Sequence, residues 1–88
     1  MNPRVTAVMA LDGQHLPLHL HLNFNNGEQR RLDLRPYLAY PVFDRLRESS
    51  FFALAQADHG TVSWPGGIDL DPDSVYLESV PIVHTASA

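Results

Sequence analysis

Alternation of apolar and polar residues is the clearest pattern in this chain, and it covers Leu16 to Phe24. The even positions of this segment are Leu, Leu, Leu, Leu and Phe, and the odd positions between them are Pro, His, His and Asn. A period of two predicts a β-strand with one buried face, whereas a helical period would place His19 and Asn23 on the apolar stripe. The leucines are therefore expected to face the core, and the two histidines to face water.

A β-hairpin is predicted next, because Asn25-Asn26-Gly27 separates this strand from a second alternating segment, residues 28–34. A two-residue loop would place Leu20 opposite Asp33 on the core face. A three-residue loop with a left-handed glycine pairs Leu20 with Leu32 instead. Matching of the leucine faces favours the three-residue loop.

Shorter patterns predict further elements. The β-branched run Val5 to Ala10 is expected to be a strand beside the Leu16–Phe24 strand. Pro36 and Pro41 are each placed to open a short helix, since the first turn does not need their N–H groups. Asp71, which precedes a proline, is expected to cap a later short helix.

A second hairpin is predicted over Leu54 to Trp64, with Asp58-His59-Gly60 as a three-residue loop. Gly60 would supply the positive φ angle of this loop. In this register Gln56 lies opposite Val62.

The length of the chain bounds its architecture. It has 88 residues and a mass of 9.8 kDa, and 44% of the residues are hydrophobic, which is enough for one domain and too little for two. We expect an α+β fold of about five to six short antiparallel strands, with short helices packed on one face. This domain is expected to span residues 1–79, followed by a flexible tail, residues 80–88.

Composition excludes several classes of protein. The formal net charge is −4, which argues against a free-standing nucleic-acid binder. The chain has no cysteine, so disulfides, zinc fingers and thiol catalysis are excluded. Its apolar runs are far shorter than the roughly 18 residues needed to cross a membrane, and it opens on no secretory segment. We therefore expect a cytoplasmic protein without a membrane association.

His19, His21 and Asp33 form the sharpest chemical constellation. Alternate strand positions place both imidazoles on one face, and the preferred register sets Asp33 opposite His19, which gives the ligand types of a two-histidine, one-carboxylate metal site. The competing interpretation is an exposed polar face with a His19–Asp33 ion pair. It is favoured because His21 lies opposite Arg31, whose charge would repel a cation.

Arg30, Arg31 and Arg35 cluster in the sequence around the second strand of the first hairpin. Guanidinium groups could bind a phosphate or the carboxylates of a partner in bidentate fashion, which makes these arginines candidate binding residues. A solvated face is the simpler interpretation, since acidic residues are interleaved with them.

Four aromatic residues are candidates for lining a pocket: Tyr37, Tyr40, Trp64 and Tyr76. Such residues more often complete a small core while a phenol reaches water.

Two blocks in the second half of the chain carry a resemblance: Gly60-Thr61-Val62-Ser63-Trp64-Pro65, and Gly67-Ile68-Asp69-Leu70-Asp71-Pro72-Asp73-Ser74-Val75-Tyr76. From Arg31 to Tyr76 the chain resembles the bacterial family known as domain of unknown function 2442. The resemblance implies a small α+β domain and no catalytic residue set. Some family members carry an added helix-turn-helix domain or are encoded beside candidate toxin–antitoxin partners. This chain ends soon after Tyr76, so we expect no such added domain and no direct contact with nucleic acid.

The leading functional hypothesis is a non-enzymatic protein-interaction or regulatory accessory module that needs no cofactor. Its partner is expected to be another protein, of the toxin–antitoxin type, and exposed strand edges offer a way to bind it. A homodimer formed by sheet extension is a further hypothesis. The alternative class is a metal-binding or small-ligand-binding protein, or an enzyme, that uses His19, His21 and Asp33.

Overall fold

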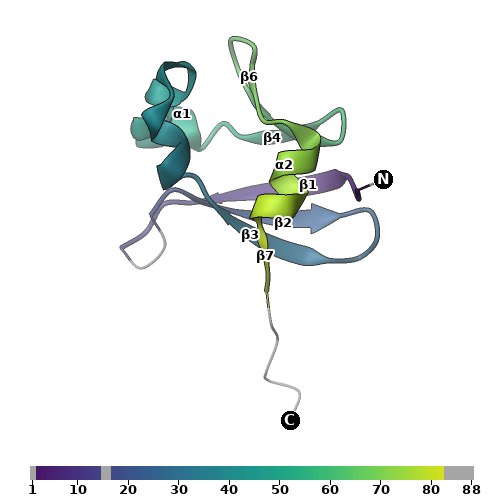
Figure 1. Ribbon diagram of the computed structural model, residues 1–88. Helices are drawn as coiled ribbons and strands as arrows, with labels where there is room; N and C mark the ends of the chain where they lie inside the picture. Colours follow the sequence, from purple (N-terminus) through teal and green to yellow (C-terminus); the bar gives the residue numbers. More distant parts are fainter. Residues whose placement is uncertain (1, 15–16, 83–88) are drawn as a thin grey trace.

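Within residues 2–14 and 17–82, which the computed structural model describes, the chain forms two antiparallel sheets and four short helical segments (Figure 1). The elements in chain order are β1 (Val5–Leu11), β2 (His19–Phe24), β3 (Gln29–Asp33), the 3-10 helices η1 (Arg35–Ala39) and η2 (Pro41–Arg47), α1 (Ser49–Phe52), β4 (Gln56–Asp58), β5 (Thr61–Trp64), β6 (Ile68–Asp69), α2 (Pro72–Glu78) and β7 (Val80–Pro81). The predicted α+β class is confirmed. In this part of the chain there are seven strands rather than five to six, because the two residues of β7 have no pattern that predicts a strand.

The four-stranded sheet has the order β1-β2-β3-β7. In the β2–β3 hairpin Leu20 lies opposite Leu32 and His19 lies opposite Asp33, so the predicted register is confirmed. Gly27 has a φ of 90°, the left-handed conformation that the three-residue loop requires. The predicted pairing of the first strand with this hairpin is also confirmed, since β1 runs antiparallel to β2.

The strand β2 begins later than predicted, at His19 rather than Leu16. Leu18 has a φ of 54°, a left-handed conformation that interrupts the alternation, and its N–H donates to Oδ1 of Asp12. Leu16 lies outside the described residues. The Asp12 side chain, rather than further strand pairing, therefore holds Leu18, the residue just before β2.

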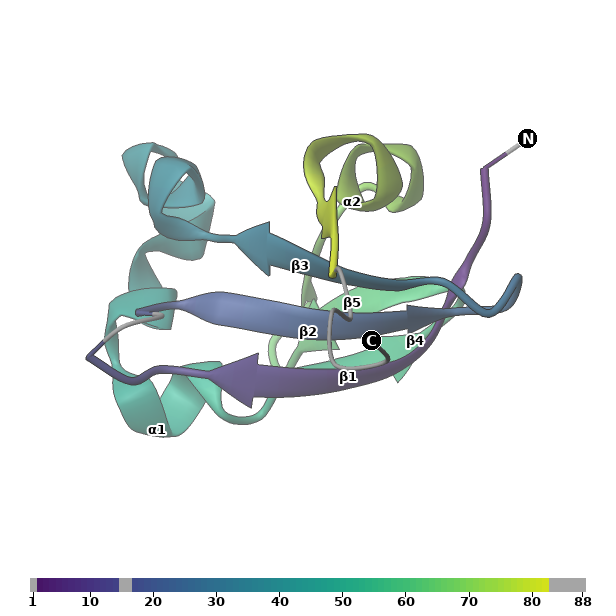
Figure 2. The ribbon, with the colours of Figure 1, turned by 90° about the horizontal axis from the view of Figure 1, so that it is seen from below.

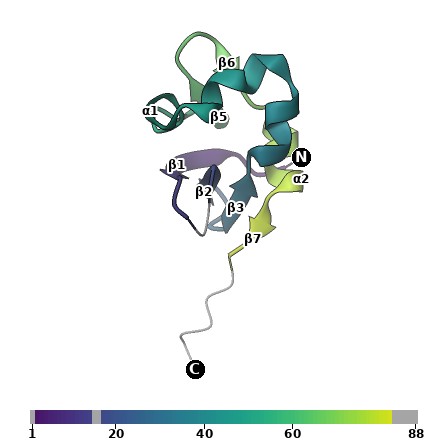
Figure 3. The ribbon, with the colours of Figure 1, turned by 90° about the vertical axis from the view of Figure 1, so that its left-hand side faces the viewer.

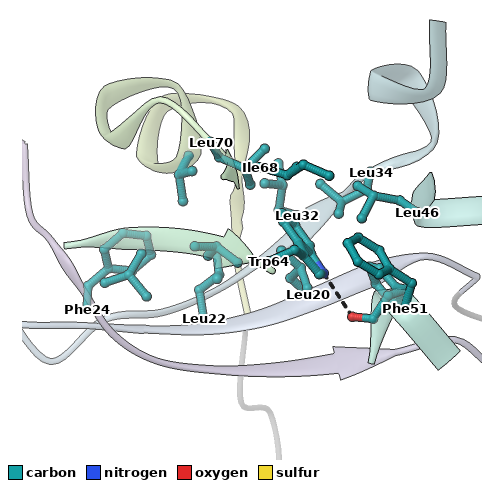
Figure 4. Close-up of a cluster of buried hydrophobic side chains, with 14 residues drawn as sticks. Leu20, Leu22, Phe24, Leu32, Leu34, Leu46, Phe51, Trp64, Ile68 and Leu70 are labelled. Atoms are coloured by element: carbon teal, nitrogen blue, oxygen red, sulfur yellow. Dashed lines mark hydrogen bonds between the residues drawn. The ribbon is translucent and has the colours of Figure 1, made fainter. Parts of the chain in front are cut away.

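One face of the four-stranded sheet carries the core. Leu20 and Leu22 of β2 are fully buried, and so is Leu34 after β3 (Figure 4). The second sheet and the helices all lie over this face, as Figures 1 and 3 show from two sides. The expectation that the leucines of the alternating segment face the core is confirmed for Leu20 and Leu22. Trp64 completes the core, and its indole N–H donates to the carbonyl of Phe52 at 3.0 Å.

The three-stranded sheet, of order β4-β5-β6, corrects one prediction. Gln56 lies opposite Ser63 rather than Val62, so the loop has two residues, His59 and Gly60, instead of three. Both have positive φ angles, 52° and 79°, which is the backbone of a type I′ turn. The three-residue loop was wrong because His59, although not a glycine, adopts the left-handed conformation.

The short helices begin near the predicted prolines. η1 and η2 each carry proline in their first turn and are 3-10 helices, the tighter form that short segments adopt. Asp71 caps α2 as predicted, since its carboxylate accepts from the N–H of Ser74. None of the helices in the described ranges has the length and apolar character needed to cross a membrane.

The end of the domain also differs from the expectation. Val80 and Pro81 fall within the predicted flexible tail, but they pair with Arg31 and Arg30 of β3 as the strand β7. The N–H of Ile82 donates to the carbonyl of Gln29, which extends this pairing by one further bond. The sheet therefore continues past residue 79. Residues 83–88 lie outside the described part of the chain.

Candidate functional site

His19 and Asp33 lie together, as the register requires, but their environment differs from the one predicted. The Nε2 atom of His19 is 4.0 Å from Oδ2 of Asp33, and its Nδ1 atom is 2.9 Å from the carbonyl oxygen of Pro17. His19 is only 9% exposed, because it stands between its cross-strand neighbours Leu11 and Asp33 at the end of the sheet. The expectation that both imidazoles face water is therefore wrong for His19.

Asp33 is already bound by Arg35. Its two carboxylate oxygens accept from Nε and Nη2 of Arg35 at 2.7–3.1 Å, and Oδ1 also accepts from the Arg35 backbone N–H at 2.9 Å. The hydrogen bonds from the Arg35 guanidinium are the main reason why the pKa of Asp33 lies below its ordinary value. This carboxylate is fully engaged within the protein.

His21 takes no part in that contact. Its Nε2 atom is 3.2 Å from Oε1 of Gln29, and Arg31 lies opposite it in the register. In the described parts of the chain no three His, Asp or Glu side chains gather as a metal-ligand group. The geometry thus brings together His19 and Asp33 of the predicted constellation and leaves His21 apart.

The three candidate arginines do not share one surface. Arg30 lies opposite the buried Leu22, on the core side of the sheet, whereas Arg31 lies opposite His21 on the other side. The Arg30 side chain is 12% exposed and binds within the protein, and Arg35 binds Asp33. The cluster in the sequence is therefore not a patch in space, because neighbouring strand residues point to opposite faces.

The aromatic candidates also separate. Trp64 is buried in the core, and Tyr76 packs edge-on against Phe24 with ring centres 5.3 Å apart. Tyr37 and Tyr40 line a groove between η1, η2 and α2. Of the two tyrosines that remain available to a ligand, Tyr37 lies in η1 and Tyr40 lies between η1 and η2.

The strongest candidate for contact with another molecule is β1, at the edge of the four-stranded sheet (Figure 2). Its sequence, Val-Thr-Ala-Val-Met-Ala-Leu, holds no charged residue and no proline. Within the described residues, the backbone hydrogen bonds of β1 to elements other than β2 are limited to one, from the N–H of Val5 to the carbonyl of Gly60 at 3.0 Å. From Thr6 to Leu11 the outward row of N–H and C=O groups makes no backbone hydrogen bond among the described residues, although β4 lies close to this strand.

The sheet face next to this edge is not covered by any described helix or strand (Figures 1 and 3). We call it the outer face, and it carries Ala7, Met9, Leu11, His19, His21, Asn23, Gln29, Arg31 and Asp33. Met9 is 62% exposed, and a hollow of about 350 Å³ lies beside it, with Ala7 and His21 among its lining residues. The edge and the outer face are therefore continuous. The uncharged run at 5–11 was visible in the sequence, but its edge position was not.

Comparison with known proteins places the chain in a family. No curated protein and no solved structure matches it. The model of the family described as "Protein of unknown function (DUF2442)" matches residues 10–81, from within β1 to the end of β7. This match covers β2 to β7, all the described helices and the last two residues of β1, so the chain belongs to the DUF2442 family.

Proposed function

We propose that this protein is a non-enzymatic protein-interaction module, which binds an extended segment of another protein as an added strand along β1. The outward edge of β1 carries the proposal, because its backbone groups from Thr6 to Leu11 make no backbone hydrogen bond among the described residues. Backbone N–H and C=O groups give affinity in this mode of binding, and alternate side chains give specificity.

The composition of β1 supports this function. Natural proteins protect exposed edge strands with charged side chains, proline or a covering element, because an open edge recruits other chains. The seven residues of β1 include no charged residue and no proline. A β-bulge falls between Val5 and Ala7, and β4 lies close to β1, but from Thr6 onward no backbone group of a described residue is bonded to the outward edge. Such an edge fits a protein that uses it for binding.

The outer face supplies side-chain contacts for the same partner. Every second residue of an added strand would lie over this face beside Met9 and the hollow next to it. Exposed methionine suits this role, since its flexible thioether adapts to differently shaped side chains.

The metal-binding or enzymatic alternative has less support. A metal site would need the carboxylate of Asp33, which Arg35 holds in a bidentate ion pair. The resemblance to a bacterial family with toxin–antitoxin neighbours favours a small protein of that type as the partner. The chain has no cysteine and so needs no disulfide, which is compatible with a location in the reducing cytoplasm.

Affinity capture with matched variants tests the proposal. The tagged protein is used to capture partners from cells of its source, in parallel with the double variant Ala7→Lys/Met9→Lys. Both residues are exposed, so the fold should tolerate the change, while lysine on the edge blocks strand addition. Leu77→Lys on α2 is the control, because Leu77 is equally exposed and apolar but lies away from the edge.

The proposal expects a protein that is captured by the wild type and by Leu77→Lys and is lost with the double variant. Hydrogen exchange on that complex should show new protection of amides between Thr6 and Leu11. A partner that the double variant captures equally well contradicts strand addition. Sedimentation of the purified wild type tests whether a second copy of this chain occupies the β1 edge instead. In that case the sedimenting mass of the wild type rises with concentration, and the double variant stays monomeric.

A further inference from the structure

A groove of about 440 Å³ separates the 3-10 helices η1 and η2 from α2. It lies on the core side of the four-stranded sheet, away from the outer face, where Figure 3 shows the teal helical segments beside α2. Ligand pockets in proteins have volumes of about 300–1,000 Å³, so this groove has room for one long side chain and its flanking backbone.

Aromatic rings form one wall of the groove. Tyr37 and Phe43 pack edge-to-face, with ring centres 5.6 Å apart and planes at 79°. Tyr40 lies beside them and is 61% exposed, so most of its ring faces solvent rather than the core. These rings offer apolar faces with negative electrostatic potential to whatever enters the groove.

Two carboxylates, of Asp71 and Glu78, also line the groove. Glu78 accepts a hydrogen bond from the phenol of Tyr37, which holds its carboxylate at the groove. Asp71 uses Oδ2 to accept from the N–H and hydroxyl of Ser74 at the start of α2. No described residue that lines the groove carries a positive charge. The groove therefore holds two carboxylates without a cation to balance them.

The electrostatics of Tyr37 reflect the same arrangement. Burial is the main reason why the pKa of the Tyr37 phenol is raised, followed by its hydrogen bond to Glu78 and by the charges of Glu78 and Asp71. The phenol stays neutral at physiological pH and remains a donor to Glu78. Both carboxylate charges act at the same ring.

We propose that this groove binds the side chain of an arginine in a partner protein, with its guanidinium group facing Glu78 and Asp71 and its plane against the tyrosine rings. A guanidinium group is planar, stacks on aromatic faces and pairs with carboxylates in bidentate fashion. An ammonium group is a more strongly hydrated point charge that stacks less well, which favours arginine over lysine. This site is separate from the β1 edge and does not depend on strand addition.

A peptide titration followed by NMR tests the proposal on the full chain. The probe is the capped pentapeptide Gly-Ser-Arg-Ser-Gly, compared with the same peptide carrying citrulline, which is the neutral isostere of arginine, or lysine. The arginine peptide should shift the amide signals of Tyr37, Tyr40 and Ser74 in a saturable way. Its affinity should exceed that of the citrulline peptide at least about fivefold, with lysine between them.

Two variants test the groove residues. Glu78→Gln retains an acceptor for the Tyr37 phenol but removes the charge, so it should abolish the preference for arginine over citrulline. Tyr40→Ala truncates an exposed ring and should weaken binding of the arginine peptide at least about threefold. The matched controls are Glu48→Gln and Leu77→Ala, which change exposed residues outside the groove and should bind like the wild type.

Three results would overturn the proposal. The first is equal affinity for the arginine and citrulline peptides, and the second is the absence of shifts at the groove up to about 10 mM peptide. The third is an arginine preference that survives Glu78→Gln. Because the strand-addition test changes only Ala7 and Met9, failure of either proposal can be told apart from failure of the other.

Discussion

The guanidinium carbon of Arg30 lies 4.4 Å from the centre of the Tyr76 ring. The same guanidinium donates to both the hydroxyl and the carbonyl oxygen of Ser79 at 2.7 Å, and to Glu28 at 3.0 Å. Tyr76 belongs to α2, and Ser79 follows that helix directly. One arginine of β3 therefore fixes the C-terminal end of α2 against the four-stranded sheet.

This arrangement predicts opposite outcomes for two neighbouring arginines. Arg30→Met should lower the free energy of unfolding by about 2–3 kcal/mol, because it removes charged hydrogen bonds and leaves the hydroxyl and carbonyl oxygens of Ser79 without this donor. Arg31→Met is the control. Arg31 faces the other side of the sheet, so its replacement should cost less than about 0.5 kcal/mol. Urea denaturation of both variants measures the difference, and equal losses would contradict the assignment of Arg30 to a structural role.

The ion pair of Asp33 and Arg35 predicts a dependence of stability on pH. The pKa of Asp33 in the folded protein lies below its ordinary value of 3.8, mainly because of hydrogen bonds from Arg35. A carboxyl group with a lowered pKa stabilises the folded state above the unfolded pKa, and this contribution is lost as the pH falls through the folded value.

The wild type should therefore be more stable than Asp33→Asn at neutral pH, and the difference should vanish once the pH is well below 3.8. The pair is partly exposed, so the difference at neutral pH should not exceed about 1 kcal/mol. Arg35→Ala removes the donor and should flatten the same part of the profile. Urea denaturation between about pH 6 and pH 2 gives the curves, and parallel profiles for the wild type and Asp33→Asn would show that the ion pair contributes nothing.

The two hairpins show how far sequence reasoning reaches. In the first hairpin a one-residue slip would have turned Leu20 away from Leu32, so the burial of leucine selects a single register. In the second hairpin the choice depended on whether a non-glycine residue adopts a left-handed conformation. The identity of residue 59 as histidine does not reveal whether its φ angle is positive. In the structure the loop also accepts a hydrogen bond from a distant part of the chain, from the N–H of Val5 to the carbonyl of Gly60.

The candidate sites were harder to predict, because they depend on contacts between parts of the chain that are distant in sequence. The pairing of His19 with Asp33 follows from the register, but the capture of Asp33 by Arg35 depends on the turn into η1. The groove depends on Tyr37 and Glu78, which are 41 positions apart and meet only in the folded chain. The edge position of β1 likewise follows from the sheet order. Local periodicity determines faces, whereas these sites depend on which elements become neighbours.

Trp64 provides a test of the core. Its indole N–H donates to the carbonyl of Phe52, and its ring stacks on that of Phe52 with centres 6.4 Å apart. Trp64→Phe removes the donor and leaves a small cavity, so it should lower the free energy of unfolding by about 1–3 kcal/mol. The exposed Tyr40 is the control, since Tyr40→Phe changes no core contact and should be nearly neutral. Thermal unfolding followed by circular dichroism measures both, and a neutral Trp64→Phe variant would contradict this account of the core.

His59 offers a stabilising substitution. It adopts a φ of 52° beside Gly60 at 79°, and the type I′ turn that they form is most favourable with the sequence Asn-Gly. His59→Asn should therefore raise the free energy of unfolding by about 0.5 kcal/mol, since asparagine tolerates the left-handed conformation better than histidine.

The matched variant is His59→Val, in which a β-branched side chain occupies the same left-handed position. It should lower the free energy of unfolding by about 1–2 kcal/mol. Because the His59 side chain is 90% exposed and its partner Asp58 is 51% exposed, loss of their ion pair should contribute little to either result. Denaturation of the three proteins gives the order Asn, His, Val from most to least stable. Any other order would contradict the left-handed conformation of residue 59 in this type I′ turn.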